Sequence, residues 1–152
     1  MVEINLPEQT KALLEGDIFA MDDQIDDTRL AKFLFYVPTV VKEFGVAIAE
    51  LRRQKRDLEK EVLLLESQLE QREASVLLDL DVSRYTNESL RKAAVVEDEE
   101  VISLKGQVVQ TKRDMLDYDS DIDELTEKYW GFKSLKDSLE SITKLRVSER
   151  TF

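Results

Sequence analysis

The chain has 152 residues and a formal net charge of −11, with 36% charged residues but only four glycines and two prolines. This composition favours long helices and argues against an all-β or Rossmann-type domain. Cysteine and histidine are both absent, which excludes disulfides, thiolate nucleophiles and histidine-based acid–base or metal sites. The acidic balance also argues against broad nonspecific binding of nucleic acid. We therefore expect one all-helical domain that is not an enzyme and needs no cofactor.

The first segment, residues 1–38, predicts short helices. Pro7 suits the first turn of a helix that ends near Gly16. Asp27 or Thr28 can cap a second helix, whose apolar face ends just before Pro38. Because proline removes a backbone donor and crowds the preceding turn, Pro38 is expected either to kink this helix or to end it. The apolar residues of the second helix are Leu30, Phe33, Leu34 and Val37.

Residues 39–80 predict a long helix. Mostly apolar residues recur there at alternating steps of four and three, which is the a/d spacing of a coiled coil. The set is Leu51, Lys55, Leu58, Val62, Leu65, Leu69, Arg72 and Val76. Such a helix is about 60 Å long and needs a partner along its length. The four successive apolar residues from Val62 to Leu65 cover most of its circumference, so we expect a further partner helix from another subunit.

Residues 81–97 predict a connector with a short helix, capped by Thr86 or Asn87. A second long helix is expected over 98–146, with a tail over 147–152. Its a/d set is Val101, Leu104, Val108, Thr111, Met115, Tyr118, Ile122, Leu125, Tyr129 and Phe132, and a set of shifted phase follows at Leu135, Leu139, Ile142 and Leu145. Because the two long helices are similar in length, they predict an antiparallel hairpin or coiled coil.

A hairpin with this much apolar surface is expected to assemble into a homo-oligomer. The residues that we assign to oligomerisation are Val62, Leu65, Leu69, Trp130, Phe132, Leu135, Leu139 and Ile142. The aromatic C-terminal part of this set has other interpretations. It is also compatible with a docking face for a partner protein, or with a basic helix on a membrane surface.

The sequence shows no nucleophile–base pair and no phosphate-binding glycine loop. Two aspartate groups resemble metal-binding patterns: Asp22, Asp23, Asp26 and Asp27, and Asp117, Asp119, Asp121 and Asp123. The second group lacks the glycine and the final glutamate of a calcium loop. We interpret both as helix caps and solvated helix surface, and we expect no metal site.

No apolar run approaches a membrane span and the N-terminus does not resemble a signal peptide, so we expect a cytoplasmic protein without a membrane partner.

Basic residues gather in a few places, of which the segment after the first long helix is the most suggestive. Arg84, Arg91 and Lys92 lie there, and Tyr85 can stack a base beside them. These four residues are predicted to contact DNA. The group from Arg52 to Arg56 is interpreted as intrahelical pairing with acidic neighbours, with a phosphate-binding ring across subunits as the alternative.

Several short motifs follow one another in a recognisable order. They are Leu13-Leu14 with Asp17-Ile18-Phe19, then Leu34-Phe35-Tyr36, then Ser89-Leu90-Arg91-Lys92-Ala93-Ala94-Val95, then the acidic run before Val101, and finally Lys128-Tyr129-Trp130-Gly131-Phe132. Over nearly the whole chain, this order resembles the recombination mediator family of T-even-like phages, the UvsY type.

The resemblance implies a homo-oligomeric helical ring in which the C-terminal region helps assembly. It also implies binding of single-stranded DNA, and loading of a RecA-like recombinase onto DNA covered by a single-strand-binding protein. The DNA contact of the family corresponds to the second half of the first long helix, where Arg72 is the basic residue of the stretch 71–79. Two other functions stay open: a structural coiled-coil protein such as a virion scaffold, and an acidic inhibitor that mimics DNA.

Overall fold

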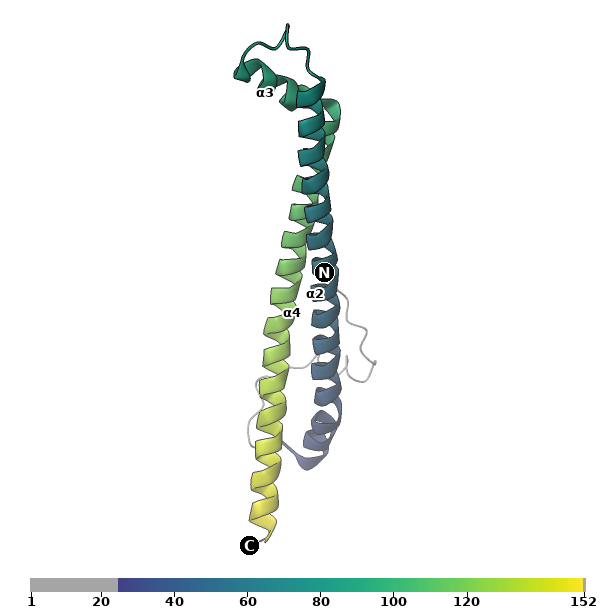
Figure 1. The fold of residues 1–152 in the computed structure, drawn as a ribbon. Helices are drawn as coiled ribbons and strands as arrows, with labels where there is room; N and C mark the ends of the chain where they lie inside the picture. The colour runs from purple at the N-terminus through teal and green to yellow at the C-terminus, as the bar shows by residue number, and fades with distance from the viewer. Residues whose placement is uncertain (1–24, 152) are drawn as a thin grey trace. The chain divides into compact units, whose positions relative to one another are not determined.

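The computed structural model describes residues 25–151. Within them, every element of regular secondary structure is an α-helix: α2 spans Asp27–Asp79, α3 spans Glu88–Glu97 and α4 spans Glu99–Thr151 (Figure 1). The prediction of an all-helical fold with packed long helices is confirmed. The second long helix continues beyond the predicted end at residue 146, so most of the expected tail is helical.

The described chain divides into two compact units, and both long helices contribute to each of them. One unit, here called the terminal unit, contains residues 25–51 and 120–151. The other, here called the connector unit, contains residues 52–119 and therefore all of α3. The predicted helix that ends near Gly16, and the aspartates Asp22 and Asp23, lie outside the described residues.

Pro38 lies inside α2, which passes through it as one helix. The sequence left a kink and a break as alternatives, and no break occurs. Proline removes one helical hydrogen bond and crowds the turn before it, which costs helix stability. Burial on both sides offsets that cost, since Phe33, Val37 and Val40 each expose 2% or less of their surface. Tertiary packing thus overrides the local preference of proline.

Two neighbouring aspartates fix the start of α2 in the terminal unit. Asp26 is the N-cap, because its Oδ1 accepts a hydrogen bond of 2.8 Å from the backbone N–H of Arg29. Asp27, predicted as a cap, instead binds the guanidinium groups of Arg150 and of Arg146, the latter at 2.8 Å. Hydrogen bonds from Arg150 and then Arg146 lower the pKa of Asp27. The start of α2 therefore lies beside the end of α4, as an antiparallel pair requires.

The core of the terminal unit contains a matched change of register. Along α2, Phe44 lies between two successive steps of four residues, from Val40 to Ile48. Along α4, Phe132 lies between two successive steps of three residues. The two rings pack with centroids 5.4 Å apart. A repeated four-residue step unwinds a heptad pattern and a repeated three-residue step overwinds it, so two opposite irregularities meet at one core position.

The connector unit is an antiparallel pair of helix segments. Glu66 of α2 binds Lys112 of α4 at 2.9 Å, and Glu73 binds Lys105 at 3.6 Å, so residues later in α2 meet residues earlier in α4. The core between them consists of Leu65, Leu104 and Val108, with Leu69 packed against it. Every residue of the a/d set predicted for the first long helix is buried or half-buried.

Candidate nucleic-acid interface

The residues predicted to contact DNA lie mainly in one segment of the connector unit, here called the tip and defined as residues 80–92. It comprises the loop after α2 and the first half of α3, and it lies where α2 ends and α4 begins (Figure 1). The tip holds three cations and two carboxylates, so it is locally basic in an otherwise acidic chain. Such a local excess of positive charge attracts phosphate even where the net charge is negative.

Asp81 organises the loop of the tip. Its Oδ1 accepts hydrogen bonds from the hydroxyl of Ser83 at 2.7 Å and from the Ser83 backbone N–H at 3.0 Å. These bonds, the hydroxyl first, lower the pKa of Asp81. The Asp81 carbonyl accepts bonds of 3.0 Å from the backbone N–H groups of Arg84 and Tyr85. This turn, in which a short acidic side chain bonds its own following backbone, fixes the direction in which Arg84 and Tyr85 leave the chain.

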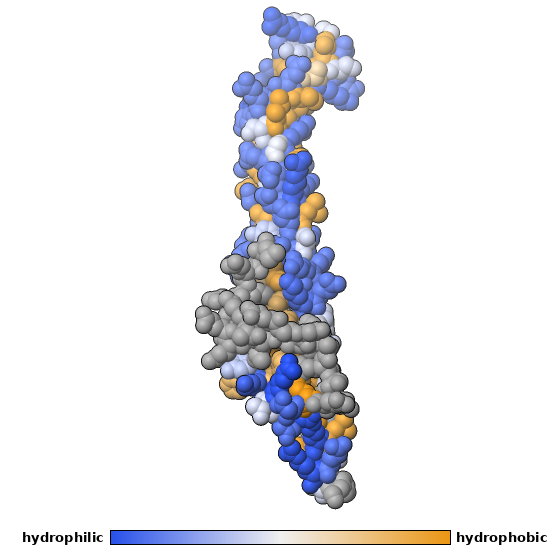
Figure 2. Space-filling model, turned by 180° about the vertical axis from the view of Figure 1, so that it is seen from behind, coloured by the Kyte–Doolittle hydropathy of each residue, from blue (hydrophilic) through white to orange (hydrophobic). Residues whose placement is uncertain are grey.

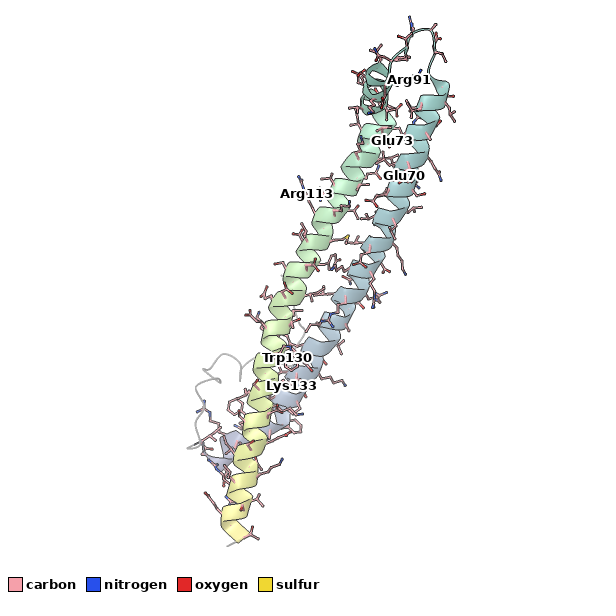
Figure 3. The ribbon with its side chains drawn as sticks, turned by 60° about the vertical axis from the view of Figure 1, so that its left-hand side comes forward. Glu70, Glu73, Arg91, Arg113, Trp130 and Lys133 are labelled. Atoms are coloured by element: carbon pink, nitrogen blue, oxygen red, sulfur yellow. The ribbon has the colours of Figure 1, made fainter. Side chains whose placement is uncertain are left out.

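Arg91 joins α3 to the loop. Asn87 is the N-cap of α3, because its side chain accepts a hydrogen bond of 2.8 Å from the Leu90 N–H. One turn into the helix, the Nε of Arg91 donates to the carbonyl oxygen of Tyr85 at 3.1 Å. Figure 3 shows Arg91 on α3 at this end of the connector unit. The bond uses one nitrogen of the guanidinium group, so the two terminal nitrogens remain able to bind a ligand.

A hollow of about 470 Å³ lies between the loop and α3. Its lining includes Tyr85, Arg91 and Lys92, three of the residues predicted to contact DNA. Tyr85 is half-buried, and the two cations are exposed. The structure thus brings an aromatic ring and two cations to one concave surface. Arg84 lies in the same loop and is exposed, but it does not line the hollow.

The cations of the tip differ in how far they are already engaged. Lys92 binds Glu88 at 2.8 Å, but both side chains are largely exposed, and such an exposed pair contributes little and exchanges readily. Among the described residues, neither Arg84 nor Arg91 has a carboxylate partner within salt-bridge distance. Arg84 and Arg91 are therefore the cations of the tip best placed to meet phosphate.

Arg72, the fifth residue predicted to contact DNA, does not line this hollow. Its guanidinium group makes a two-point contact with Asp98, from Nη2 at 2.9 Å and from Nε at 3.1 Å, and it also binds Glu100 at 3.1 Å. The hydrogen bond to Asp98 is the main cause that raises the pKa of Arg72. A cation held by two carboxylates has little attraction left for phosphate. The geometry gives Arg72 a structural role, and our DNA interface no longer includes it.

Asp98 connects all three helices of the connector unit. Its backbone N–H bonds the Val95 carbonyl at the end of α3, and its Oδ2 accepts a bond of 3.0 Å from the Val101 N–H at the start of α4. Its carboxylate also binds Arg72 of α2. These contacts, with the bond from Arg72 first, hold the pKa of Asp98 below its ordinary value of 3.8. Asp98 thus sets where α3, and with it the tip, lies relative to both long helices of this unit.

The Asp98 contact predicts a specific pH dependence. Because the folded-state pKa of Asp98 is lowered, its contribution is complete above the unfolded pKa and is lost as the pH falls through the folded pKa. Asp98→Asn keeps an N-cap but removes the charge, so it should lower the urea midpoint at pH 7. The difference in urea midpoint between this variant and wild type should become smaller as the pH falls. The matched control is Glu99→Gln, which removes an exposed charge from the same turn and should change little. If the Asp98→Asn variant lost the same stability at every pH, charge would not be the origin of the loss.

Most residues assigned to oligomerisation are already buried within one chain. Val62 and Leu65 lie in the interior of the connector unit, while Phe132, Leu135 and Leu139 lie in the interior of the terminal unit. Leu69 and Ile142 are half-buried. Leu65 packs against Leu104 and Val108 of the opposite helix, and Phe132 packs against Phe44. Because most of the set is buried, a second subunit has no access to most of these side chains. The apolar surface that is available in the connector unit lies elsewhere, for example at Leu63 and Leu64, which are 67% and 59% exposed.

Trp130 is the exposed member of that set, at 55%. Tyr129 packs edge-on against its ring with centroids 5.4 Å apart, and the Nζ of Lys133 lies 4.7 Å from the ring centroid. Trp130 and Lys133 lie close together on α4 in Figure 3. A shallow hollow beside Trp130 is lined by the acidic residues Asp123, Glu124 and Glu127. This surface is acidic and aromatic, which suits a protein partner better than it suits DNA.

The aspartates from Asp117 to Asp123 lie along α4 and are not gathered. Asp119 binds Lys55 of α2 at 2.6 Å. Ile122, which lies among the aspartates in the sequence, is buried. Across residues 25–151, no group of three potential ligands is placed to hold a metal ion.

No helix in this part of the chain has both the length and the apolar character to cross a membrane.

Sequence reasoning missed two kinds of residue in and around the tip. Asp81 and Asp98 organise it, and the apolar residues Leu77, Leu80 and Val82 line its hollow. An aspartate two residues before a serine, and one before a run of acids that opens a helix, are local signals that point to such roles. No local signal shows that apolar side chains remain exposed, because exposure depends on what packs around them.

Comparison with known proteins adds no relationship: the chain matches no protein-family model, no curated protein sequence and no solved structure.

Proposed function

We propose that the protein is a recombination mediator that binds single-stranded DNA and helps load a RecA-like recombinase onto DNA covered by a single-strand-binding protein. The observation that carries the proposal is the tip, where Tyr85, Arg91 and Lys92 line one hollow and Arg84 leaves the adjoining loop. Basic side chains combined with an aromatic ring are the usual means of binding single strands. The motif order described above, which resembles the mediator family, supplies the biological process.

In this proposal several subunits act together. One tip offers a few exposed cations, and each phosphate contact alone is weak and sensitive to salt. In a homo-oligomer the same strand meets several tips, so that the second and later contacts become intramolecular and the affinities multiply. The strand is then held away from its covering protein and is presented to the recombinase. Because recombinases act on intracellular DNA, the proposal places the protein in the host cytoplasm.

In this proposal the subunits meet through exposed apolar residues of the connector unit. Leu63 of α2 and Ile102, Val109 and Leu116 of α4 are all largely exposed, and the three α4 residues recur every seven positions. A stripe with that period lies along one side of a helix. Exposed apolar side chains in a row are typical of surfaces that become covered. We assign the subunit contact to this stripe in place of Val62, Leu65 and Leu69.

The proposal is tested by a loading assay. A recombinase with DNA-dependent ATPase activity is added to single-stranded DNA that is covered by its single-strand-binding protein, and the lag before hydrolysis is measured with and without this chain. We expect the chain to shorten the lag in proportion to its concentration, up to saturation of the DNA. An unchanged lag would contradict the mediator function and favour a structural protein. A longer lag, together with no binding to DNA, would identify an acidic inhibitor of the recombinase.

A further inference from the structure

We propose that the hollow of the tip holds one unstacked nucleobase of single-stranded DNA. This inference rests on the proposed function but goes further, because it separates the recognition of a base from the attraction of phosphates. It makes the tip a selector of single strands, since a paired base would first have to leave its duplex. The site is built from three parts: an apolar floor, an aromatic wall and a charged rim.

The floor is formed by Leu77 in the last turn of α2 and by Leu80 and Val82 in the loop. Leu77 and Val82 are exposed, and Val82 exposes 75% of its surface. Apolar side chains that gather in a concave surface without cover are typical of a ligand site. Hydrophobic surface also gathers near this end of the connector unit in Figure 2. A floor of this kind accepts a flat apolar face and offers nothing to a hydrated ion.

The wall is formed by Tyr85. Its backbone is fixed twice, by the N–H bond to Asp81 and by the bond that its carbonyl oxygen accepts from Arg91. Tyr85 as a whole is half-buried, and it lines the hollow. A tyrosine whose backbone is held in this way loses little freedom when a base stacks on it. Stacking on an aromatic ring tolerates any base, because every base has a π-face.

The rim carries Arg91, Lys92 and Glu88. The two cations suit the phosphate groups on either side of a base that has entered the hollow. The Glu88 carboxylate is a hydrogen-bond acceptor that suits an exocyclic amino group on the edge of a base. An apolar side chain of a protein partner would also fill the floor, but it would leave Arg91, which has no carboxylate partner among the described residues, without an anion. The combination of charges therefore favours a nucleotide.

The volume is consistent with this occupant. At about 470 Å³, the hollow falls within the range of roughly 300–1,000 Å³ that is usual for small-molecule sites. It is open to solvent at the rim, where the strand continues to the next tip. The site therefore captures one base per subunit, while the neighbouring nucleotides stay outside.

The first test separates stacking from charge by the salt dependence of binding. Tyr85→Ala should weaken the binding of labelled single-stranded DNA by about fivefold to a hundredfold at every salt concentration, without changing the slope of log affinity against log salt. Arg91→Gln should instead flatten that slope. Tyr85→Phe keeps the ring and should bind like wild type, which controls for damage to the loop. Unaltered affinity in a folded Tyr85→Ala variant would overturn the proposal.

The second test removes the base and leaves the phosphates. Wild type should bind a thymidine oligonucleotide more tightly than an abasic oligonucleotide of equal length, and Tyr85→Ala should lose most of this preference. Equal affinity of wild type for both oligonucleotides would overturn the base site while leaving DNA binding intact. Absence of binding to either would instead contradict the proposed function itself.

Two further competitors identify the source of the base. Thymidine monophosphate should displace the labelled strand only at concentrations far above that of the oligonucleotide, because it engages a single tip. Displacement at comparable concentrations would overturn the assignment to a DNA strand in favour of a free nucleotide. An RNA of the same sequence tests the choice of strand, and stronger competition by RNA than by DNA would overturn the assignment to DNA.

Discussion

Reversing the charges of Arg84 and Arg91 together, as Arg84→Glu with Arg91→Glu, should weaken single-stranded DNA binding at low salt by about tenfold or more. Both side chains are exposed, and neither has a carboxylate partner among the described residues. The reversal therefore removes attraction for phosphate and adds repulsion, while it breaks only the bond from Arg91 to the Tyr85 carbonyl. Fluorescence anisotropy at two salt concentrations measures the change, and circular dichroism checks that helicity is retained.

The matched control is Arg52→Glu with Arg56→Glu. These arginines are also exposed, lie in the same connector unit, and give the same change in net charge. They should leave affinity within about threefold of wild type if the tip is the interface, because only long-range electrostatics changes. Equal losses in both double variants would indicate general attraction, or a phosphate site on α2. Lys92 is left out of the tip variant because its reversal would place two carboxylates one helical turn apart, at Glu88 and at residue 92.

Replacing Leu139 by alanine should destabilise the fold by about 2–5 kcal/mol. Leu139 exposes 1% of its surface and lies in the core of the terminal unit, so its truncation leaves a cavity in that core. The matched control is Leu145→Ala, on the same helix and in the same unit, where the side chain is 63% exposed. That change should stay within about 0.5 kcal/mol. Urea denaturation followed by circular dichroism measures both.

The pair also tests the register of the end of α4. The sequence placed Leu145 in the apolar set, whereas the helix turns it to solvent and directs its neighbour Arg146 toward Asp27. A large loss in Leu145→Ala would show that this residue is covered, either by the chain or by another subunit. A negligible loss in Leu139→Ala would contradict the packing of the terminal unit.

Heptad spacing predicted the fold well where apolar residues recur without interruption. The set from Leu51 to Val76 and the set from Val101 to Phe132 are buried or half-buried throughout. Such patterns are informative because a helix repeats its contacts every seven residues, so the register follows from sequence alone. The all-helical fold and the packing of two long helices followed from that regularity.

Prediction was weaker where tertiary contacts override local preference. The sequence left open whether Pro38 kinks or ends its helix, and the burial of Phe33 and Val40 around it favours the continuous α2 that is observed. The change of phase after Phe132 is visible in the sequence, but its pairing with the opposite change at Phe44 is not, since that pairing depends on how the two helices pack. Spacing also cannot show whether an a/d residue faces its own chain or a second subunit.

At the candidate site, residue type and position in the chain predicted part of the arrangement. Tyr85, Arg91 and Lys92 were assigned together because they follow the end of a long helix, and they line one hollow. Arg72 was assigned by resemblance, and its pairing with Asp98 became visible only in three dimensions. The two residues are 26 positions apart, so no local pattern links them.

The most direct test of the central claim is an anisotropy titration of the wild-type protein with labelled single-stranded DNA, on a sample whose assembly state is measured by light scattering. We expect a defined oligomer that binds with a steep salt dependence. The slope of log affinity against log salt should have a magnitude of about 0.7 for each phosphate contacted on a single strand. A defined oligomer that fails to bind even at low salt would contradict the account, and the protein would then have to act through its helical surfaces alone.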